Sequence, residues 1–366
     1  MSSPSAGPSR LVCYGWDETL DEQFTSHRAA GLIPARVAAV DRGLCDVVTE
    51  HGPMRAATRP AHPDPHAAPE PSAAPCTGDW AALRPGGAGG RPVVAALLPR
   101  RTAIVRSSAA RDSRGQVLAA NVDTVAVTVS LAARLDLGRT ERLLALAYDS
   151  GARPLIVLTQ ADRPPATAGA EAVIAAAAPG IDVVACSAAT GDGVGAVRAA
   201  VTGTVALIGP SGTGKSTLGN ALLGRDALGT GAVRERDGKG RHTTVRRELL
   251  PLPGGGVLID TPGLRGVGLF AASEGLARTF ADVEELAGRC RFGDCAHRTE
   301  PGCAVLAAVQ DGTLAPRRLA SYRKLERENA WIASRSDARL TAERRGRRKE
   351  ISRWQRRMYR ERGRDR

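Results

Sequence analysis

The stretch GPSGTGKST, residues 209–217, constrains the fold more than any other feature of the sequence. It matches the phosphate-binding pattern G-x-x-x-x-G-K-S, and an apolar strand-like segment precedes it while a helix-like segment follows it. Glycines let backbone N–H groups turn toward phosphate oxygens, and the helix N-terminus favours the same anions. We expect Lys215 to lie over the β- and γ-phosphates and Ser216 to bind Mg²⁺. The loop residues predicted to contact a nucleotide are Gly209, Pro210, Ser211, Gly212, Thr213, Gly214, Lys215, Ser216 and Thr217.

Two further motifs, TQAD and SAATGDG, precede this loop. A carboxylate at the end of a parallel strand can accept both N1–H and N2–H of guanine, whereas adenine offers no such pair of donors. Asp162 therefore predicts selection of GTP over ATP. Taken singly, TQAD also suits an ordinary strand end and SAATGDG an ordinary turn. The predicted base-side contacts are Thr159, Gln160, Ala161, Asp162, Ser187 and Ala188.

Two motifs follow the loop. LIDTPG (258–263) ends an apolar strand, and we expect it to bring Asp260 to the Mg²⁺ region and the Gly263 N–H near the γ-phosphate. GKGRHTT (238–244) lies between, and its two threonines can sense the γ-phosphate. One of them completes the metal shell, and the sequence does not decide which. The predicted magnesium ligands are Ser216, Thr243, Thr244 and Asp260.

The order of these motifs is unusual, because an ordinary GTPase carries its base-reading motifs on the last two strands. Here they come first, so the sequence predicts a circularly permuted GTPase domain, which is feasible where chain ends lie close together. Short apolar strands alternate with helical stretches, which indicates a parallel sheet covered on both faces. The expected strands are 122–131, 154–158, 181–186 and 204–208, and the expected helices are 139–150, 168–178 and 193–201.

The chain before this region has short strand-like segments that suit a small all-β barrel: ARVAAV (35–40), CDVV (45–48), VVAALL (93–98) and AIVR (103–106). The Pro- and Ala-rich stretch 59–75 interrupts them and reads as a loop insertion, in which His62 and His66 lack partners at metal-ligand spacing. Residues 1–33 are expected to be a flexible N-terminal segment.

The segment CRFGDCAHRTEPGC (290–303) supplies three thiols and an imidazole. Such a set suits a closed tetrahedral Zn²⁺ site, and with four protein ligands no position remains for catalytic water. We therefore expect one structural zinc ion; redox-active or unrelated thiols are the alternative. The predicted zinc ligands are Cys290, Cys295, His297 and Cys303.

Charge points to a polyanionic partner. The net charge is +13 at a pI of about 10.2, and residues 341–366 hold twelve Lys/Arg against four acids. Trp354 and Tyr359 lie among these cations, a pattern that suits RNA phosphate contact and base stacking, with a solvated tail as the alternative. No apolar run reaches a membrane-spanning length and no secretory signal is evident, so a cytoplasmic protein that does not bind membranes is expected.

Together these motifs resemble the ribosome small subunit-dependent GTPase A family of circularly permuted bacterial GTPases. The resemblance runs from about residue 34 and includes LPRRTAIVRS, GRHTT, DTPGLR and the cysteine segment. It implies an OB-type barrel (34–110, insertion 59–79), the permuted GTPase (111–273), a helical zinc-knuckle domain (274–340) and the basic tail. It also implies partners, the 30S subunit and its 16S rRNA, and GTP hydrolysis that the subunit stimulates. We expect a monomer.

Two departures from the family pattern stand out. Gln160 occupies the place of the lysine in N/T-K-x-D, which leaves base selection to Asp162 and weakens the expected affinity. The barrel also carries the proline-rich insertion. Leu264 stands where many GTPases have a water-orienting Gln, and the resemblance assigns that catalytic task to His242. His242 could instead contact RNA. A P-loop ATPase or kinase, and an rRNA-binding scaffold with negligible catalysis, are the competing interpretations.

Overall fold

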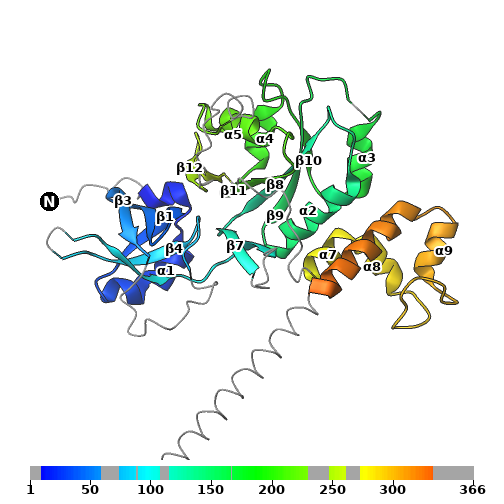
Figure 1. Cartoon of the computed structure of the whole chain (residues 1–366), viewed down its shortest axis with the longest axis horizontal. Helices are drawn as coiled ribbons and strands as arrows, with labels where there is room; N and C mark the ends of the chain where they lie inside the picture. The colour runs from blue at the N-terminus through cyan, green and yellow to red at the C-terminus, as the bar shows by residue number, and fades with distance from the viewer. Residues whose placement is uncertain are drawn as a thin grey trace, which may run out of the picture.

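The computed structural model describes residues 10–58, 74–87, 90–107, 115–165, 167–229, 247–260 and 273–332. Over these residues the chain forms a barrel, a central sheet covered by helices, and a helical C-terminal unit, with the sheet between the other two (Figure 1). The stretch 59–73, the GRHTT motif, the TPG of DTPG and the basic tail lie outside the described residues. No helix in the described ranges is long and apolar enough to span a bilayer.

The barrel consists of β1 (Ile33–Asp41), β2 (Leu44–Thr49), β3 (Gly52–Ala57), β4 (Trp80–Arg84) and β5 (Val93–Leu97). The sheet closes in the order β1-β2-β3-β5-β4, and its pairs are antiparallel except β3 with β5. Small apolar side chains, among them Ala35, Val37, Val47 and Ala81, fill the interior. The barrel that the short apolar segments predicted is confirmed.

AIVR is not a strand of this barrel, and the expectation that it would be one is wrong. It lies in β6 (Ala103–Ser107), which pairs with β7 (Gly115–Ala120) in a separate two-stranded ribbon. The reason is where the ribbon buries its apolar side chains. Ile104 and Leu118 belong to the core of the central sheet, so β6 and β7 are drawn to that sheet.

Residues 10–33 also differ from the flexible segment that we expected. They hold a 3-10 helix, η1 (Arg10–Tyr14), and a helix, α1 (Glu18–Ala29), which begins where the side chain of Asp17 accepts from the Leu20 N–H at 2.9 Å. Leu11, Leu20 and Phe24 are fully buried against Trp80 of the barrel. The segment is polar overall, so its composition did not indicate a helix, but its three buried apolar residues hold it on the barrel.

The central sheet has the order β10-β9-β8-β11-β13-β12, in which every pair is parallel except β12 with β13. Its helices cover both faces, as predicted. Alternate residues of β8 face opposite ways: Val125 and Val127 share a core with α2 and α3, while Ala126 shares one with α4 and α5. The elements are β8 (Thr124–Ser130), α2 (Leu137–Asp149), β9 (Arg153–Thr159), α3 (Ala170–Ala177), β10 (Val183–Ala185), α4 (Val194–Ala200), β11 (Thr204–Ile208), α5 (Lys215–Leu223), β12 (Leu249–Pro251) and β13 (Val257–Ile259).

The C-terminal unit contains α7 (Ser273–Thr279), α8 (Ala281–Ala287), α9 (Ala304–Gln310) and a helical segment over 316–332. It packs on α2 (Figure 1) and continues the core on that face of the sheet. Arg318 is 3% exposed and donates to Glu141 of α2 and to Asp282 of α8. Because Glu141 is fully buried, this ion pair fixes the C-terminal unit on the sheet domain.

A buried arginine joins the barrel to the sheet. Arg36 on β1 donates to Asn121 O (3.1 Å) and Thr204 Oγ1 (3.0 Å), and its guanidinium lies 4.5 Å from the centroid of the Trp80 ring. Burial lowers the pKa of Arg36 to about 10, so it stays charged at neutral pH. Since Thr204 begins β11, the barrel is attached to the strand that leads into the phosphate-binding motif.

Candidate nucleotide site and metal site

The motifs predicted to contact nucleotide meet at one edge of the sheet. Parallel strands end at the same edge, and TQAD follows β9, the serine motif follows β10, the phosphate loop follows β11 and Asp260 follows β13. Asp162 lies just after β9, and Lys215 follows the phosphate loop that comes after β11. In the sheet, only β8 separates β9 from β11. Residues more than fifty positions apart therefore share this edge, as the permuted order requires.

The phosphate loop has the backbone that its glycines predict. Gly209, Gly212 and Gly214 have φ of 154°, 83° and 74°, and a Cβ on Gly209 would lie 2.2 Å from Thr128 Oγ1. α5 begins at Lys215, whose Nζ donates to Gly209 O (2.9 Å) and Pro210 O (2.5 Å). The ammonium group thus lies over the loop, and Ser216 and Thr217 follow it in the first turn of α5.

Two hydroxyls brace the loop from the neighbouring strands. Thr128 Oγ1 on β8 donates to Ile208 O at 3.1 Å and lies 2.7 Å from Thr213 Oγ1. Thr159 Oγ1 on β9 donates to Thr213 O at 2.8 Å. Both threonines are buried, so these hydrogen bonds are shielded from water. Thr159 was among the predicted residues, but Thr128 was not, because a threonine inside an apolar strand gives no signal of its own.

Gln160 joins the base-side motif to the phosphate loop. Its backbone is left-handed, with φ of 60°. Its side-chain Oε1 accepts from Ser130 Oγ at 2.5 Å, and its Nε2 donates to Gly212 O at 3.3 Å. The amide therefore braces the phosphate loop from the position where the family pattern has lysine. It carries no charge, and its side chain is shorter than that of lysine.

Asp162 is held by the serine of the second base-side motif. Ser187 Oγ donates to Asp162 Oδ1 at 2.7 Å, and this hydrogen bond lowers the pKa of Asp162. Asp162 is exposed and ionised at neutral pH, as a receptor for two N–H donors must be. The Ser187 N–H donates to Asp192 O at 2.8 Å, which leaves Ala188 as the backbone donor of this motif for a base oxygen.

Among the predicted magnesium ligands, Ser216 and Asp260 lie at this edge. The Asp260 N–H donates to Glu248 O at 3.0 Å, which ties the end of β13 to the segment before β12. Thr243 and Thr244 fall outside the described residues, as do His242 and Leu264.

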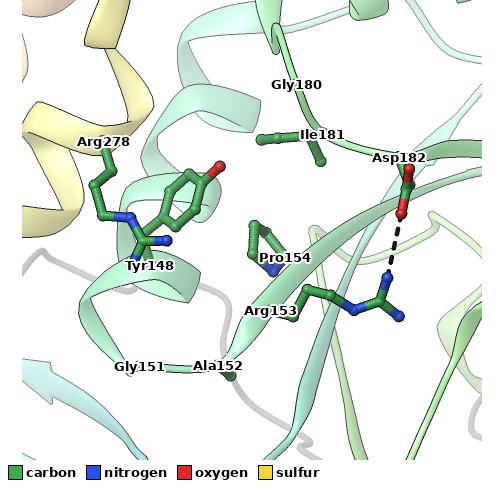
Figure 2. Close-up of a pocket in the computed structure, with 9 residues that line it drawn as sticks. All are labelled: Tyr148, Gly151, Ala152, Arg153, Pro154, Gly180, Ile181, Asp182 and Arg278. Carbon is green, nitrogen blue, oxygen red and sulfur yellow. Dashed lines mark hydrogen bonds and ion pairs between the residues drawn. The ribbon is translucent and has the colours of Figure 1, made fainter.

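A pocket lies near each end of the sheet strands. One, of about 370 Å³, lies beside the phosphate loop, between Pro210–Thr213 and the start of α2. The other, of about 360 Å³, is at the opposite edge, where β9 and β10 begin (Figure 2). In the latter, Arg153 pairs with Asp182 at 3.2 Å and Arg278 lies over the Tyr148 ring. It contains none of the predicted nucleotide residues, and its two arginines already have partners.

The cysteine segment forms a compact cluster between α8 and α9. The ligand atoms of Cys290, Cys295, His297 and Cys303 all lie within 4.8 Å of one another. Cys290 Sγ is 3.8 Å from Cys303 Sγ, and His297 Nδ1 is 3.6 Å and 3.5 Å from these two sulfurs. Tetrahedral bond lengths to zinc give edges of about 3.8 Å for two sulfurs and about 3.6 Å for sulfur and nitrogen. The four residues can therefore hold a metal ion of this geometry.

Comparison with known proteins agrees with this arrangement. A family model described as RsgA GTPase matches residues 97–270. The chain is 54% identical over 346 residues to the small ribosomal subunit biogenesis GTPase RsgA of Streptomyces coelicolor, covering 93% of each chain. It is 52% identical to the protein of the same name from Streptomyces avermitilis, covering 93% of this chain and 91% of the relative.

Two solved structures share the fold. YjeQ from Thermotoga maritima superposes with a TM-score of 0.61 at 23% identity, over 82% of this chain and 99% of that one. YloQ, described as a circularly permuted GTPase, gives 0.56 at 21% identity, over 84% and 96%. The permuted fold that the motif order predicted is thereby confirmed.

Proposed function

The chain belongs to the RsgA family of small ribosomal subunit biogenesis GTPases, and from this premise we propose that it binds the 30S subunit and hydrolyses GTP late in maturation of that subunit. It is a GTP hydrolase. The finer proposal is that the 30S subunit stimulates hydrolysis, and that the ligands are GTP, bound at the edge of the central sheet, and 16S rRNA. We further propose that it acts as a cytoplasmic monomer.

One observation carries the nucleotide part of this proposal. Thr159 and Gln160 of the base-side motif contact Thr213 and Gly212 of the phosphate loop directly. A single nucleotide can therefore span from Asp162, which takes the base, to Lys215, which takes the phosphates. Ser187 supports this assignment because it orients the Asp162 carboxylate and keeps it ionised. Of the other predicted loop residues, Ser211 to Thr217 can offer backbone N–H groups to the phosphates, whereas Pro210 has no N–H.

We assign Mg²⁺ to Ser216, Asp260 and one of Thr243 and Thr244. There the ion would neutralise negative charge that develops on the phosphates. His242 is proposed to orient the attacking water, since Leu264 cannot. Without the ribosomal subunit we expect turnover on the order of 10⁻⁴–10⁻² s⁻¹, as in unassisted GTPases. The subunit would accelerate it by acting on the GRHTT stretch, which lies outside the described residues.

We propose that the metal of the Cys290–Cys303 cluster is Zn²⁺ and that its role is structural. Three sulfurs and one nitrogen are the ligands that zinc prefers, and four protein ligands close the site to substrate. Cys303 also caps α9, where its Sγ accepts from the Leu306 N–H at 3.4 Å, and it packs in the shared core. The metal would therefore fix residues 290–303, the metal knuckle, on the C-terminal helices.

The deciding experiment measures phosphate release from GTP with and without mature 30S subunits. The wild-type chain should be slow alone and strongly stimulated by 30S. Asp162→Ala should lose GTP binding, whereas Asp182→Ala, an exposed carboxylate at the opposite edge, should behave as wild type (Figure 2). His242→Ala should lose stimulation with binding intact. Absence of stimulation in the wild type, or equal competition by ATP, would contradict the proposal.

A further inference from the structure

Phe292 is unusual for its exposure. The chain has only four phenylalanines, and Phe24 and Phe280 are completely buried, whereas Phe292 is 42% exposed. It lies in the metal knuckle between Cys290 and Cys295. An exposed phenylalanine on a weakly held loop indicates no function. The hydrogen bonds that hold the backbone around Phe292 are therefore important.

The backbone on either side of Phe292 is fixed. The Arg291 N–H donates to Gly302 O at 3.1 Å, and the Cys295 N–H donates to Phe292 O at 3.3 Å. Glu300 holds the rest of the loop by accepting from the N–H groups of Ala296, Arg298 and Thr299. The hydrogen bond from its own backbone N–H, together with these three, lowers the pKa of Glu300 to about 2, so the carboxylate stays ionised at neutral pH. The ring is thus held outward by a braced loop.

The surroundings of the ring are polar and not apolar. The Arg291 guanidinium lies 5.4 Å from the ring centroid, and the Arg291 side chain rests on Gly302, where a Cβ would approach it to 3.1 Å. Arg298 and Asp294 are exposed on the same segment, while Arg289 is paired with Glu285. Within the described ranges the other exposed large apolar side chains are Val12, Val173 and Trp331, which lie on other elements. A solitary ring beside arginine does not form the apolar patch that a protein partner would need.

We propose that Phe292 and Arg291 form a stacking platform for an unpaired base of single-stranded RNA. An aromatic face binds bases of any sequence, and the neighbouring guanidinium adds a phosphate contact or stacks on the base in turn. Bases inside a duplex are already stacked and are not available to the ring. The inference rests on the proposed function, because it takes the RNA partner from it and assigns one contact of that partner to the knuckle.

The test uses the full, metal-loaded chain and a fluorescent, unstructured RNA of about 12 nucleotides, within the range of single-strand sites, with a duplex of equal length for comparison. Phe292→Ala and Phe292→Leu should each weaken single-strand binding about tenfold, the scale of one stacked base. Phe292→Trp should retain binding, and its fluorescence should be quenched by the single strand. Val173→Ala, which removes an exposed apolar side chain on α3, should change nothing.

Equal loss of single-strand and duplex binding would show that the contact does not need an unpaired base, and Phe292→Leu binding like wild type would show that it does not need an aromatic ring. Either result would overturn the proposal. Zinc content of each variant shows that the knuckle is intact. Phosphate release with 30S separates the two hypotheses. If the wild type is stimulated but Phe292→Ala binds RNA normally, only the platform is wrong; if the wild type is not stimulated, the proposed function is wrong.

Discussion

The nucleotide edge and the metal knuckle are assembled in opposite ways. At the edge, Asp162 and Lys215 come from β9 and β11, and hydroxyls from β8 and β9 brace the loop between them. In the knuckle, all four ligands fall within residues 290–303, and the main-chain bonds that hold it are local. The first site exists only when the whole sheet is formed, while the second needs a metal ion and a short stretch of chain.

This difference predicts which perturbations each region can tolerate. A change at the edge is supported by the large cores on both faces of the sheet, so it should alter function more than folding. The metal ligands all come from one short stretch, so a change in the knuckle should alter local folding first. In the described residues the two regions are joined through the C-terminal helices, where Cys303 and Val305 belong to the core that α2 also lines.

The largest effect is expected from removing the metal. Cys303→Ser should abolish zinc retention, because structural sites of this type contribute about 10–16 kcal/mol of apparent binding energy to folding. Hydrogen exchange should show loss of protection over 289–310, while GTP affinity stays within about twofold of wild type. Cys45→Ser in the barrel, a buried cysteine outside the cluster, is the matched control for zinc content. A parallel loss of GTP affinity in Cys303→Ser would mean that the regions are coupled.

The connection between the regions can be cut at Glu141. Glu141 is fully buried and accepts from Arg317 and Arg318, so Glu141→Ala removes the buried carboxylate partner of Arg318 and leaves Arg318 paired with the more exposed Asp282. We expect a loss of about 3–5 kcal/mol in the free energy of unfolding, measured by denaturant titration. Glu328→Ala removes the partner of Arg142 in a salt bridge that is more exposed than the Glu141–Arg318 pair, and it should cost less than about 1 kcal/mol. If Glu141→Ala and Glu328→Ala lose the same free energy of unfolding, burial does not determine how strongly an ion pair holds the C-terminal unit on the sheet.

At the nucleotide edge, Asp162→Ala should leave unfolding unchanged and reduce GTP affinity about 100-fold, because the two N–H donors of the base lose their acceptor. The hydrogen bond from Ser187 lowers the Asp162 pKa, so the carboxylate is ionised above the usual aspartate range and loses its charge only as the pH falls below it. GTP affinity should therefore be flat from about pH 5 to pH 8. A titration step in this range that Asp162→Ala abolishes would contradict the assignment.

The sequence predicted the parts of this molecule that carry strong local signals. The glycine spacing of the phosphate loop, the motif order and the cysteine spacing led to the permuted sheet domain and the metal cluster. It did not predict α1, because Leu20 and Phe24 are scattered among polar residues and their burial depends on Trp80. It did not place β6 in the ribbon, because strand propensity says nothing about which core a strand joins. Thr128 was missed for the same reason: its role appears only when β8 and β11 lie side by side.

The smallest expected effect comes from Gln160, which tests whether contacts between strand ends hold the nucleotide edge together. Its amide donates to Gly212 O and accepts from Ser130 Oγ, so Gln160→Ala removes one brace while Thr128 and Thr159 remain. A single neutral hydrogen bond contributes about 1 kcal/mol, so GTP affinity should fall about fivefold without a change in thermal unfolding. Gln160→Lys keeps a donor toward Gly212 O and adds a longer stem and a charge near the phosphates, so affinity should rise above wild type. Both are measured by fluorescent GTP titration. If Gln160→Ala binds as well as wild type, the loop does not need this bridge, and the edge is held by its two threonines.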